Sequence, residues 1–230
     1  MGEIVMARPK YSDTEQGRRQ QEEKYQRILD AALEVFADKG FHEAKVTEIA
    51  RVAGVADGTI YLYFKNKDDL VVSLLETKVA FINELMKKSL SDIADARDRV
   101  HHMVRFHVRL AYENPALTRF LTVELRRGSA FVKTHAQKAV RTYLETWGET
   151  FEMGQRQGHF RPELDADIVK HLVFGALDYA CMAWVVNPDR TVDQLNRVMR
   201  ETTDLILRGV ATSEDGAVWT PTPDFGRVEA

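Results

Sequence analysis

The chain has 230 residues with 44% hydrophobic content, a formal net charge of −3 and a single cysteine. That length and hydrophobicity predict one or two domains with a real core. The small net charge excludes a globally basic protein, so a nucleic-acid surface would have to come from the placement of charges rather than from their sum. A single cysteine, Cys181, excludes an intrachain disulfide, and with no recognisable signal peptide we expect a cytoplasmic protein.

The chain begins with a stretch that shows no apolar period. Residues 1–20 mix charges with Pro9 and Gly17, and we expect a flexible arm. The arm is mildly basic and therefore compatible with a contact in a DNA minor groove, although a solvated tail is the commoner outcome for such a composition. Residues 21–39 follow a helical period with an inward apolar face, and Gly40 is predicted to end this helix.

Residues 45–67, KVTEIARVAGVADGTIYLYFKNK, predict two short helices separated by a tight turn. Thr47 is expected to cap the first helix, and Gly54 to end it in a left-handed conformation. Ile60 and Phe64 lie four residues apart and are expected to pack the second helix against the first. The residues left at the tip or outer side are Ala56, Asp57, Gly58, Thr59, Tyr61, Leu62 and Tyr63.

This arrangement is typical of a helix-turn-helix, whose second helix lies in the major groove of DNA. Gly58 lets the backbone approach a phosphate closely, and hydroxyl and ammonium groups can hold further phosphates. We expect that second role for Thr47, Tyr61, Tyr63, Lys65 and Lys67. From spacing alone, an ordinary helical hairpin with exposed tyrosines is the alternative.

Helices are predicted for the rest of the chain, at 68–91, 98–112, 116–127, 131–157, 165–186 and 191–209, of which 116–127 is short. The first would span roughly 36 Å and connect the head to a second module. Residues 213–230 contain prolines and no period, and we expect a disordered tail. The predicted protein is therefore all-α, with an arm (1–20), a helix-turn-helix head (21–67), a helical ligand-binding and dimerisation domain (68–212) and a tail (213–230).

The last two predicted helices differ from the others in their apolar surface. Residues 165–186 are apolar around most of the helix, and residues 191–209 carry one apolar stripe. Because a helix that is apolar on all sides needs neighbours on all sides, we expect these helices to form a four-helix interface in a homodimer. Burial in the core of one chain is the alternative. Lys170, His171 and Asp178 interrupt the apolar run, which argues against a membrane span.

No residue pattern predicts catalysis or metal binding. Histidines do not occur four residues apart as a helical metal site prefers, and we find no glycine-rich phosphate loop or nucleophile motif. Cys181 lies ten residues from His171 on the same predicted helix, too far for a nucleophile and its base. We therefore expect a buried thiol, no enzyme activity and no cofactor.

The helices between residues 98 and 186 carry large apolar residues interleaved with cations. A pocket lined in this way suits an anionic amphiphile, with its tail in the apolar interior and its phosphates against guanidinium groups. The alternative is ordinary core beside a solvated basic face. The candidate ligand-binding residues are Arg105, Phe106, Arg109, Leu110, Leu121, Leu125, Arg126, Arg127, Phe151, Phe174 and Leu177.

The stretch VTEIARVAGVADGTIYLYFKNKDDL resembles the DNA-binding signature of the TetR family of one-component bacterial repressors. That resemblance implies an all-helical homodimer that binds a palindromic operator and leaves it when a ligand binds. The segments ELR (124–126) and FGALD (174–178), the latter ending in Asp178, further resemble the fatty-acid-degradation repressors that respond to long-chain acyl-coenzyme A. Alternatives are a repressor for another apolar ligand, a helical lipid carrier without DNA binding, and an enzyme acting on acyl thioesters.

Overall fold

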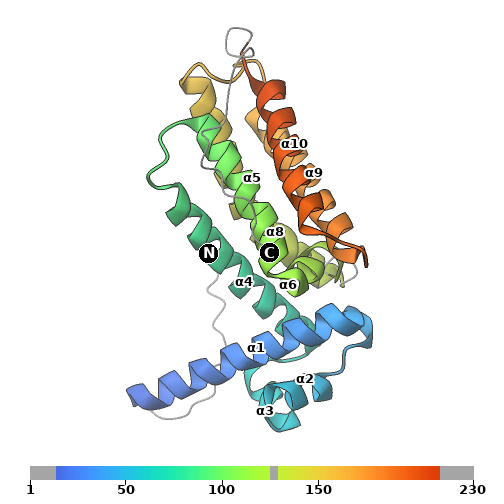
Figure 1. Ribbon diagram of the computed structural model, residues 1–230. Coiled ribbons are helices and arrows are strands. Elements are labelled where there is room, and N and C mark those ends of the chain that lie inside the picture. Colours follow the sequence, from blue (N-terminus) through green and yellow to red (C-terminus); the bar gives the residue numbers. More distant parts are fainter. Residues whose placement is uncertain (1–13, 125–128, 213–230) are drawn as a thin grey trace.

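The computed structural model describes residues 14–124 and 129–212 (Figure 1). Within these ranges the chain is helical, and its one extended pairing is an isolated antiparallel bridge between Phe160 and Ala211. The all-α prediction is therefore confirmed. The arm at residues 1–13 and the tail at residues 213–230 lie outside the described residues.

Three helices form the head: α1 (Glu15–Glu43), α2 (Val46–Ala53) and α3 (Asp57–Tyr63). Helix α1 begins at Glu15 because Thr14 caps it, its hydroxyl accepting from the backbone N–H of Gly17 at 3.2 Å. The predicted arm is therefore too long, since residues 15–20 are helical. Gly40 has a φ of 81°, which ends the regular helix as predicted before a short turn to Glu43.

The turn between α2 and α3 has most of the features predicted from the sequence. Gly54 ends α2 in the left-handed region at a φ of 64°. Ile60 and Phe64 are both buried against the head core, as predicted. The predicted cap at Thr47 is wrong, because α2 begins at Val46 and the Glu48 carboxylate accepts from the Lys45 backbone N–H at 3.4 Å.

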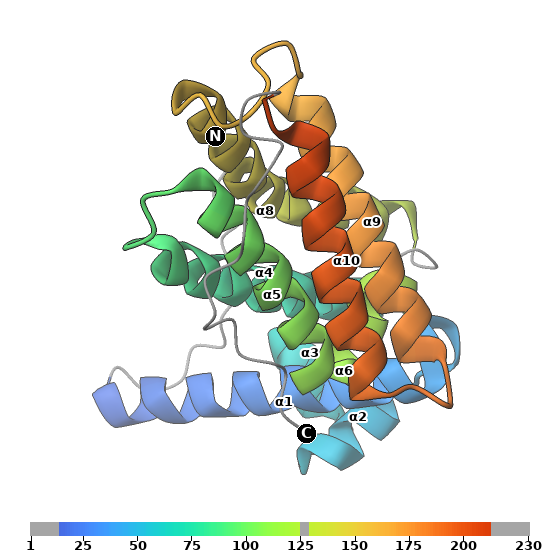
Figure 2. The ribbon, with the colours of Figure 1, turned by 45° about the horizontal axis from the view of Figure 1, so that its top comes forward.

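Within the described residues, the second module contains six further α-helices and one π-helix. They are α4 (Lys67–Leu90), α5 (Ala96–Glu113), α6 (Pro115–Arg119), α8 (Ala130–Arg156), α9 (Ala166–Val186) and α10 (Val192–Val210), with a π-helix, η1 (Phe120–Glu124), after α6. Helix α5 ends at Asn114 before Pro115, as predicted. Helix α4 rises from the head along the module, and α5, α8, α9 and α10 stand beside it as a bundle (Figures 1 and 2).

The head and the second module meet along α1. Helices α4 and α6 and the π-helix η1 all pack against α1. Phe36 of α1 and Phe120 of η1 are both buried, and their rings stack with centroids 6.1 Å apart. Lys78 of α4 also pairs with Asp30 of α1 at 2.7 Å. The first residue of η1 is therefore part of the same core as the head.

Helices α9 and α10 leave an apolar face uncovered in the single chain. Leu172 and Tyr179 of α9 are 68% and 66% exposed, and Leu205 of α10 is 72% exposed. In length and composition α9 also passes for a membrane span, but a core helix of a soluble protein passes the same test, so this is weak evidence.

Candidate DNA interface and ligand cavity

The second helix of the head presents its outer side to solvent. Tyr61 and Leu62 are 58% and 53% exposed, and Ala56, Asp57 and Gly58 are exposed at the N-terminal end of α3. Thr47 is exposed on the neighbouring helix α2. Since apolar and aromatic groups this exposed are uncommon on a short helix, the tip has the chemistry of a contact surface.

Tyr63 lies differently from Tyr61. Its ring is half-buried, at 6.2 Å from the Tyr25 ring of α1 and 6.2 Å from the Phe64 ring. Burial raises the pKa of its hydroxyl above the ordinary value, so the group is a neutral donor at pH 7. Thr59 is also half-buried. Tyr63 therefore packs α3 onto α1 as well as facing outward.

Lys67 has a role that the sequence did not predict. Its ammonium group donates to the backbone carbonyls of Phe41 at 2.7 Å, His42 at 3.1 Å and Ala44 at 3.2 Å. It also lies 4.8 Å from the centre of the Phe41 ring. Because an ammonium has three donors, these carbonyls use all of them, and the predicted phosphate contact of Lys67 is replaced by a contact within the head. Lys65 remains exposed.

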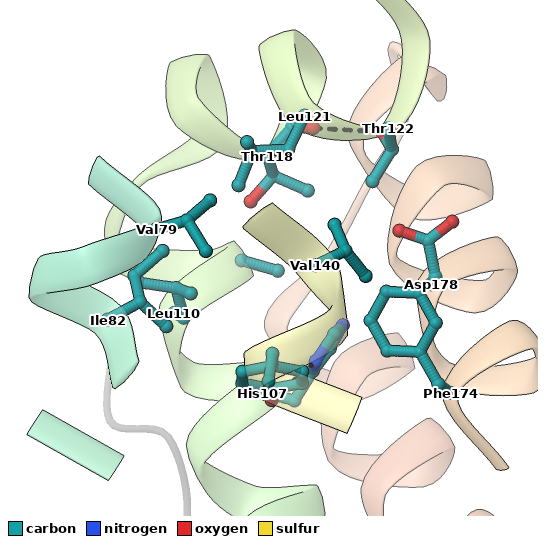
Figure 3. Close-up of a pocket in the computed structure, with 12 residues that line it drawn as sticks. Val79, Ile82, His107, Leu110, Thr118, Leu121, Thr122, Val140, Phe174 and Asp178 are labelled. Carbon is teal, nitrogen blue, oxygen red and sulfur yellow. Dashed lines mark hydrogen bonds between the residues drawn. The ribbon is translucent and has the colours of Figure 1, made fainter. Parts of the chain in front are cut away.

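An apolar cavity lies in the second module between α4, α5, α8, α9 and the α6–η1 segment (Figure 3). It holds about 630 Å³ of empty space, including the part open to solvent. Its lining consists of Val79, Ile82, His107, Leu110, Ala111, Thr118, Leu121, Thr122, Val140, Tyr143, Phe174 and Asp178.

The cavity contains four of the predicted ligand residues: Leu110, Leu121, Phe174 and Asp178. Two other predictions are wrong. Phe151 and Leu177 are buried in the core, where Phe151 stacks on Trp147, because the same helical period that predicts a pocket also describes an ordinary core face. The predicted contacts at Leu125, Arg126 and Arg127 lie outside the described residues.

A second hollow runs along the outside of α4 and α5. It is lined by Arg105, Phe106 and Arg109 of α5 together with Lys78 and the exposed Phe81 of α4. Glu113 also lines it, and its carboxylate accepts from Arg109 Nε at 2.6 Å, which leaves Arg105 and Lys78 as its other cations. This cationic groove holds about 1150 Å³ of empty space, including the part open to solvent. Ile82 and Leu110 line both the groove and the apolar cavity. Arg105 and Arg109 therefore lie next to the cavity rather than inside it.

Several residues that line the cavity were not predicted from the sequence. His107 precedes Leu110 and Ala111 by three and four residues on α5, so its helical position was the available signal. Thr118 and Thr122 come from the α6–η1 segment, where the Thr122 hydroxyl donates to the Thr118 carbonyl at 2.8 Å. A π-helix widens the chain locally and frequently occurs at functional sites, and nothing in the sequence pattern predicts it.

His107 and Tyr143 form a polar pair inside the cavity. The Nδ1 of His107 lies 3.0 Å from the Tyr143 hydroxyl, and Phe174 packs edge-on against both rings. Burial lowers the pKa of His107 to about 4, and the charge of Asp178 offsets only part of this effect. Burial also raises the pKa of Tyr143. Both groups are therefore neutral at pH 7 and act as hydrogen-bonding groups rather than charges.

No three His, Cys, Asp or Glu side chains within residues 14–124 and 129–212 are placed to share a metal ion. Cys181 is buried in α9, and burial raises the pKa of its thiol to about 12. A thiol with such a pKa is protonated at pH 7 and is a poor nucleophile. The arrangement therefore offers binding chemistry at the head and in the cavity.

Two family models match the chain. Residues 28–74 match bacterial regulatory proteins of the tetR family, and residues 75–209 match the C-terminal region of the YsiA-like proteins. The fatty acid metabolism regulator protein of Bacillus subtilis is 32% identical over 192 residues, which are 84% of this chain and 98% of that protein.

Solved structures agree with this match. The transcriptional regulator FadR from Bacillus subtilis, solved in complex with stearoyl-CoA, has a TM-score of 0.76 and 31% identity, covering 81% of this chain and 99% of its own. The fatty acid degradation regulator FadR from Bacillus halodurans has a TM-score of 0.74 and 32% identity over 81% of this chain and 99% of its own.

Proposed function

The chain belongs to the TetR family of bacterial regulatory proteins and is a TetR-type transcriptional repressor, and from that premise we propose that a long-chain acyl-coenzyme A releases it from its operator. The protein would control genes of fatty acid degradation and would act in the cytoplasm. Relatives at this identity are transcriptional regulators, which supports a binding function rather than catalysis.

One observation carries the choice of effector: the apolar cavity adjoins the cationic groove. An acyl-coenzyme A has a long alkyl chain joined to a phosphorylated head, and these two hollows share Ile82 and Leu110 as a common wall. The alkyl chain would occupy the apolar cavity, and Arg105 and Arg109 would hold the phosphates. The stearoyl-CoA bound to the Bacillus subtilis relative supports this chemistry.

The assembly that would bind DNA is a homodimer. Two copies joined by the exposed face of α9 and α10 would cover Leu172, Tyr179 and Leu205 in a four-helix interface. Because such an interface has two-fold symmetry, the operator would be palindromic, with half-sites about 34 to 36 Å apart or a multiple of that distance. The tips formed by α3 would read the two half-sites.

Release requires that the cavity be coupled to the head. Helix α4 lines the cavity with Val79 and Ile82 and begins in the head at Lys67. The π-helix η1 lines the cavity with Leu121, while its first residue, Phe120, stacks on Phe36 of the head. A ligand that displaces either element would change the angle between the heads, and these are the bistable elements we assign.

Two measurements test this function. Mass spectrometry of small molecules that co-purify with the protein should identify acyl-coenzyme A, and a mobility shift on fragments of its own promoter should disappear when stearoyl-CoA is added. If operator binding is seen but another apolar molecule co-purifies and causes release, the repressor stands and the effector assignment is wrong. If no DNA fragment binds, the protein acts as a lipid carrier.

A further inference from the structure

The apolar cavity has one polar corner. Val79, Ile82 and Leu110 line the side formed by α4 and α5, whereas Asp178 and Phe174 of α9 lie on the opposite side (Figure 3). The His107–Tyr143 pair belongs to the same lining as Asp178. A cavity built only for methylene groups would not need these side chains, because polar groups covered by an alkyl chain lose their hydrogen bonds to water.

The pair has a fixed hydrogen-bonding capacity. If the Tyr143 hydroxyl donates to Nδ1 of His107, the remaining donor is the Nε2–H of the ring, and if Nδ1–H donates to Tyr143, the remaining donor is the Tyr143 hydroxyl. In either arrangement both groups are neutral, and the pair keeps one donor for a third partner. An oxygen atom of a ligand is the complement of that donor.

We infer that the ligand of this cavity carries an oxygen atom that accepts a hydrogen bond from the His107–Tyr143 pair, so that these two residues determine which acyl chains bind. The inference rests on the proposed acyl-coenzyme A function and adds a chemical requirement to it. Two sources supply such an oxygen: the thioester carbonyl, or a hydroxyl group on the chain. A hydroxyl would in addition donate to the Asp178 carboxylate, which lines the same cavity.

The test compares ligands that differ in one oxygen. Calorimetry of the full-length protein would be carried out with stearoyl-CoA, with its thioether analogue S-octadecyl-CoA, which lacks the carbonyl, and with 3-hydroxystearoyl-CoA. Each ligand would be titrated into the unaltered protein and into the double variant His107→Phe/Tyr143→Phe. This variant keeps two aromatic rings and removes both hydrogen-bonding groups, because either residue alone would leave one donor. Val140→Ala is the matched control, because Val140 lines the same cavity with apolar atoms alone.

We expect one oxygen-bearing ligand to bind the unaltered protein about tenfold more tightly than its partner that lacks the oxygen, as one hydrogen bond provides. A preference for the thioester over the thioether assigns the carbonyl, and a preference for the hydroxylated chain assigns the hydroxyl. In the double variant that preference should fall to about twofold or less, whereas Val140→Ala should weaken all ligands together and keep the preference. Thermal unfolding would verify that both variants are folded.

Failure of the inference and failure of the proposed function give different results. If all three ligands bind the unaltered protein equally, or if the double variant His107→Phe/Tyr143→Phe keeps the preference, no hydrogen bond from this pair to a ligand oxygen selects the ligand, although acyl-coenzyme A remains the effector. If none of the three binds, the acyl-coenzyme A function is wrong and the inference is wrong with it.

Discussion

The ammonium nitrogen of Lys67 lies 2.7 Å from the carbonyl oxygen of Phe41 and 4.8 Å from the centre of the Phe41 ring. The carbonyls of His42 and Ala44 accept its other hydrogen bonds. These carbonyls lie at the end of α1 and in the turn into α2, where the helix dipole carries a partial negative charge. Lys67, the first residue of α4, thus connects this helix to the end of α1.

Lys67→Met should destabilise the head rather than remove a phosphate contact. The variant keeps a long apolar side chain but leaves the carbonyls around Phe41 without the charged donor, which should lower the free energy of unfolding by about 1.5 to 3 kcal/mol. Lys65→Met is the matched control, because Lys65 is exposed. That control should keep the stability and reduce the salt dependence of operator binding by about one counterion. Urea unfolding and binding at several salt concentrations would measure both, and a Lys67 variant of unchanged stability would contradict the assignment.

Leu205→Glu should break the proposed dimer. A charge placed in the middle of an apolar interface loses its hydration without gaining a partner, which costs several kcal/mol. We expect monomers in light scattering and a loss of operator affinity. Phe131→Glu is the control, because Phe131 is also an exposed apolar side chain but belongs to α8. A dimeric Leu205→Glu protein would place the interface elsewhere.

Acidic pH should destabilise the protein through its buried histidines. Burial lowers the pKa of His101 and of His107 from 6.5 to about 4. Between these values the unfolded chain binds more protons than the folded one, so stability is full above pH 6.5 and falls as the pH drops toward 4. Each histidine contributes at most about 3 kcal/mol. His107→Leu should reduce the loss of unfolding free energy between pH 6.5 and 4 by the contribution of one histidine. His171→Gln is the control, because His171 is exposed, and it should leave this loss unchanged. An equal dependence of stability on pH in all three proteins would mean that His107 is not buried as described.

The sequence predicted the features that depend on residues close together in the chain. The left-handed Gly54, the buried pair of Ile60 and Phe64, and the end of α5 before Pro115 each follow from local backbone or packing rules. The carbonyl partners of Lys67 lie more than twenty residues away, and no local pattern indicates them.

The ligand cavity was less predictable for the same reason. Leu177 and Phe174 lie on the same helix and are equally apolar, yet Leu177 faces the core while Phe174 lines the cavity. Which apolar side chain borders empty space depends on how five elements pack together. The His107–Tyr143 pair joins residues 36 positions apart, so only the folded chain brings it together.

Phe120→Leu should weaken the communication between ligand and DNA. Phe120 is buried and stacks on Phe36 of the head, while its neighbour Leu121 lines the cavity, so the π-helix contacts both sites. If stearoyl-CoA lowers operator affinity a hundredfold in the unaltered protein, the coupling free energy is about 2.7 kcal/mol. Loss of the stacked ring should reduce that coupling by about 1 kcal/mol. The variant should still bind stearoyl-CoA and operator DNA. Phe64→Leu is the control, because it shortens another buried aromatic ring, which stacks on Tyr25 within the head.

The coupling free energy can be measured from ligand binding or from operator binding, and the two values must agree. Since coupling between two binding sites is reciprocal, operator DNA must weaken stearoyl-CoA binding by the same factor by which stearoyl-CoA weakens operator binding. Calorimetric titrations of ligand with and without operator, for the unaltered protein, Phe120→Leu and Phe64→Leu, would give each factor. Equal ligand affinity in the presence and absence of operator would exclude release by this route in any of the three proteins. An unchanged factor in Phe120→Leu would leave α4 as the element that carries the coupling, because Val79 and Ile82 connect the cavity to the head without the π-helix.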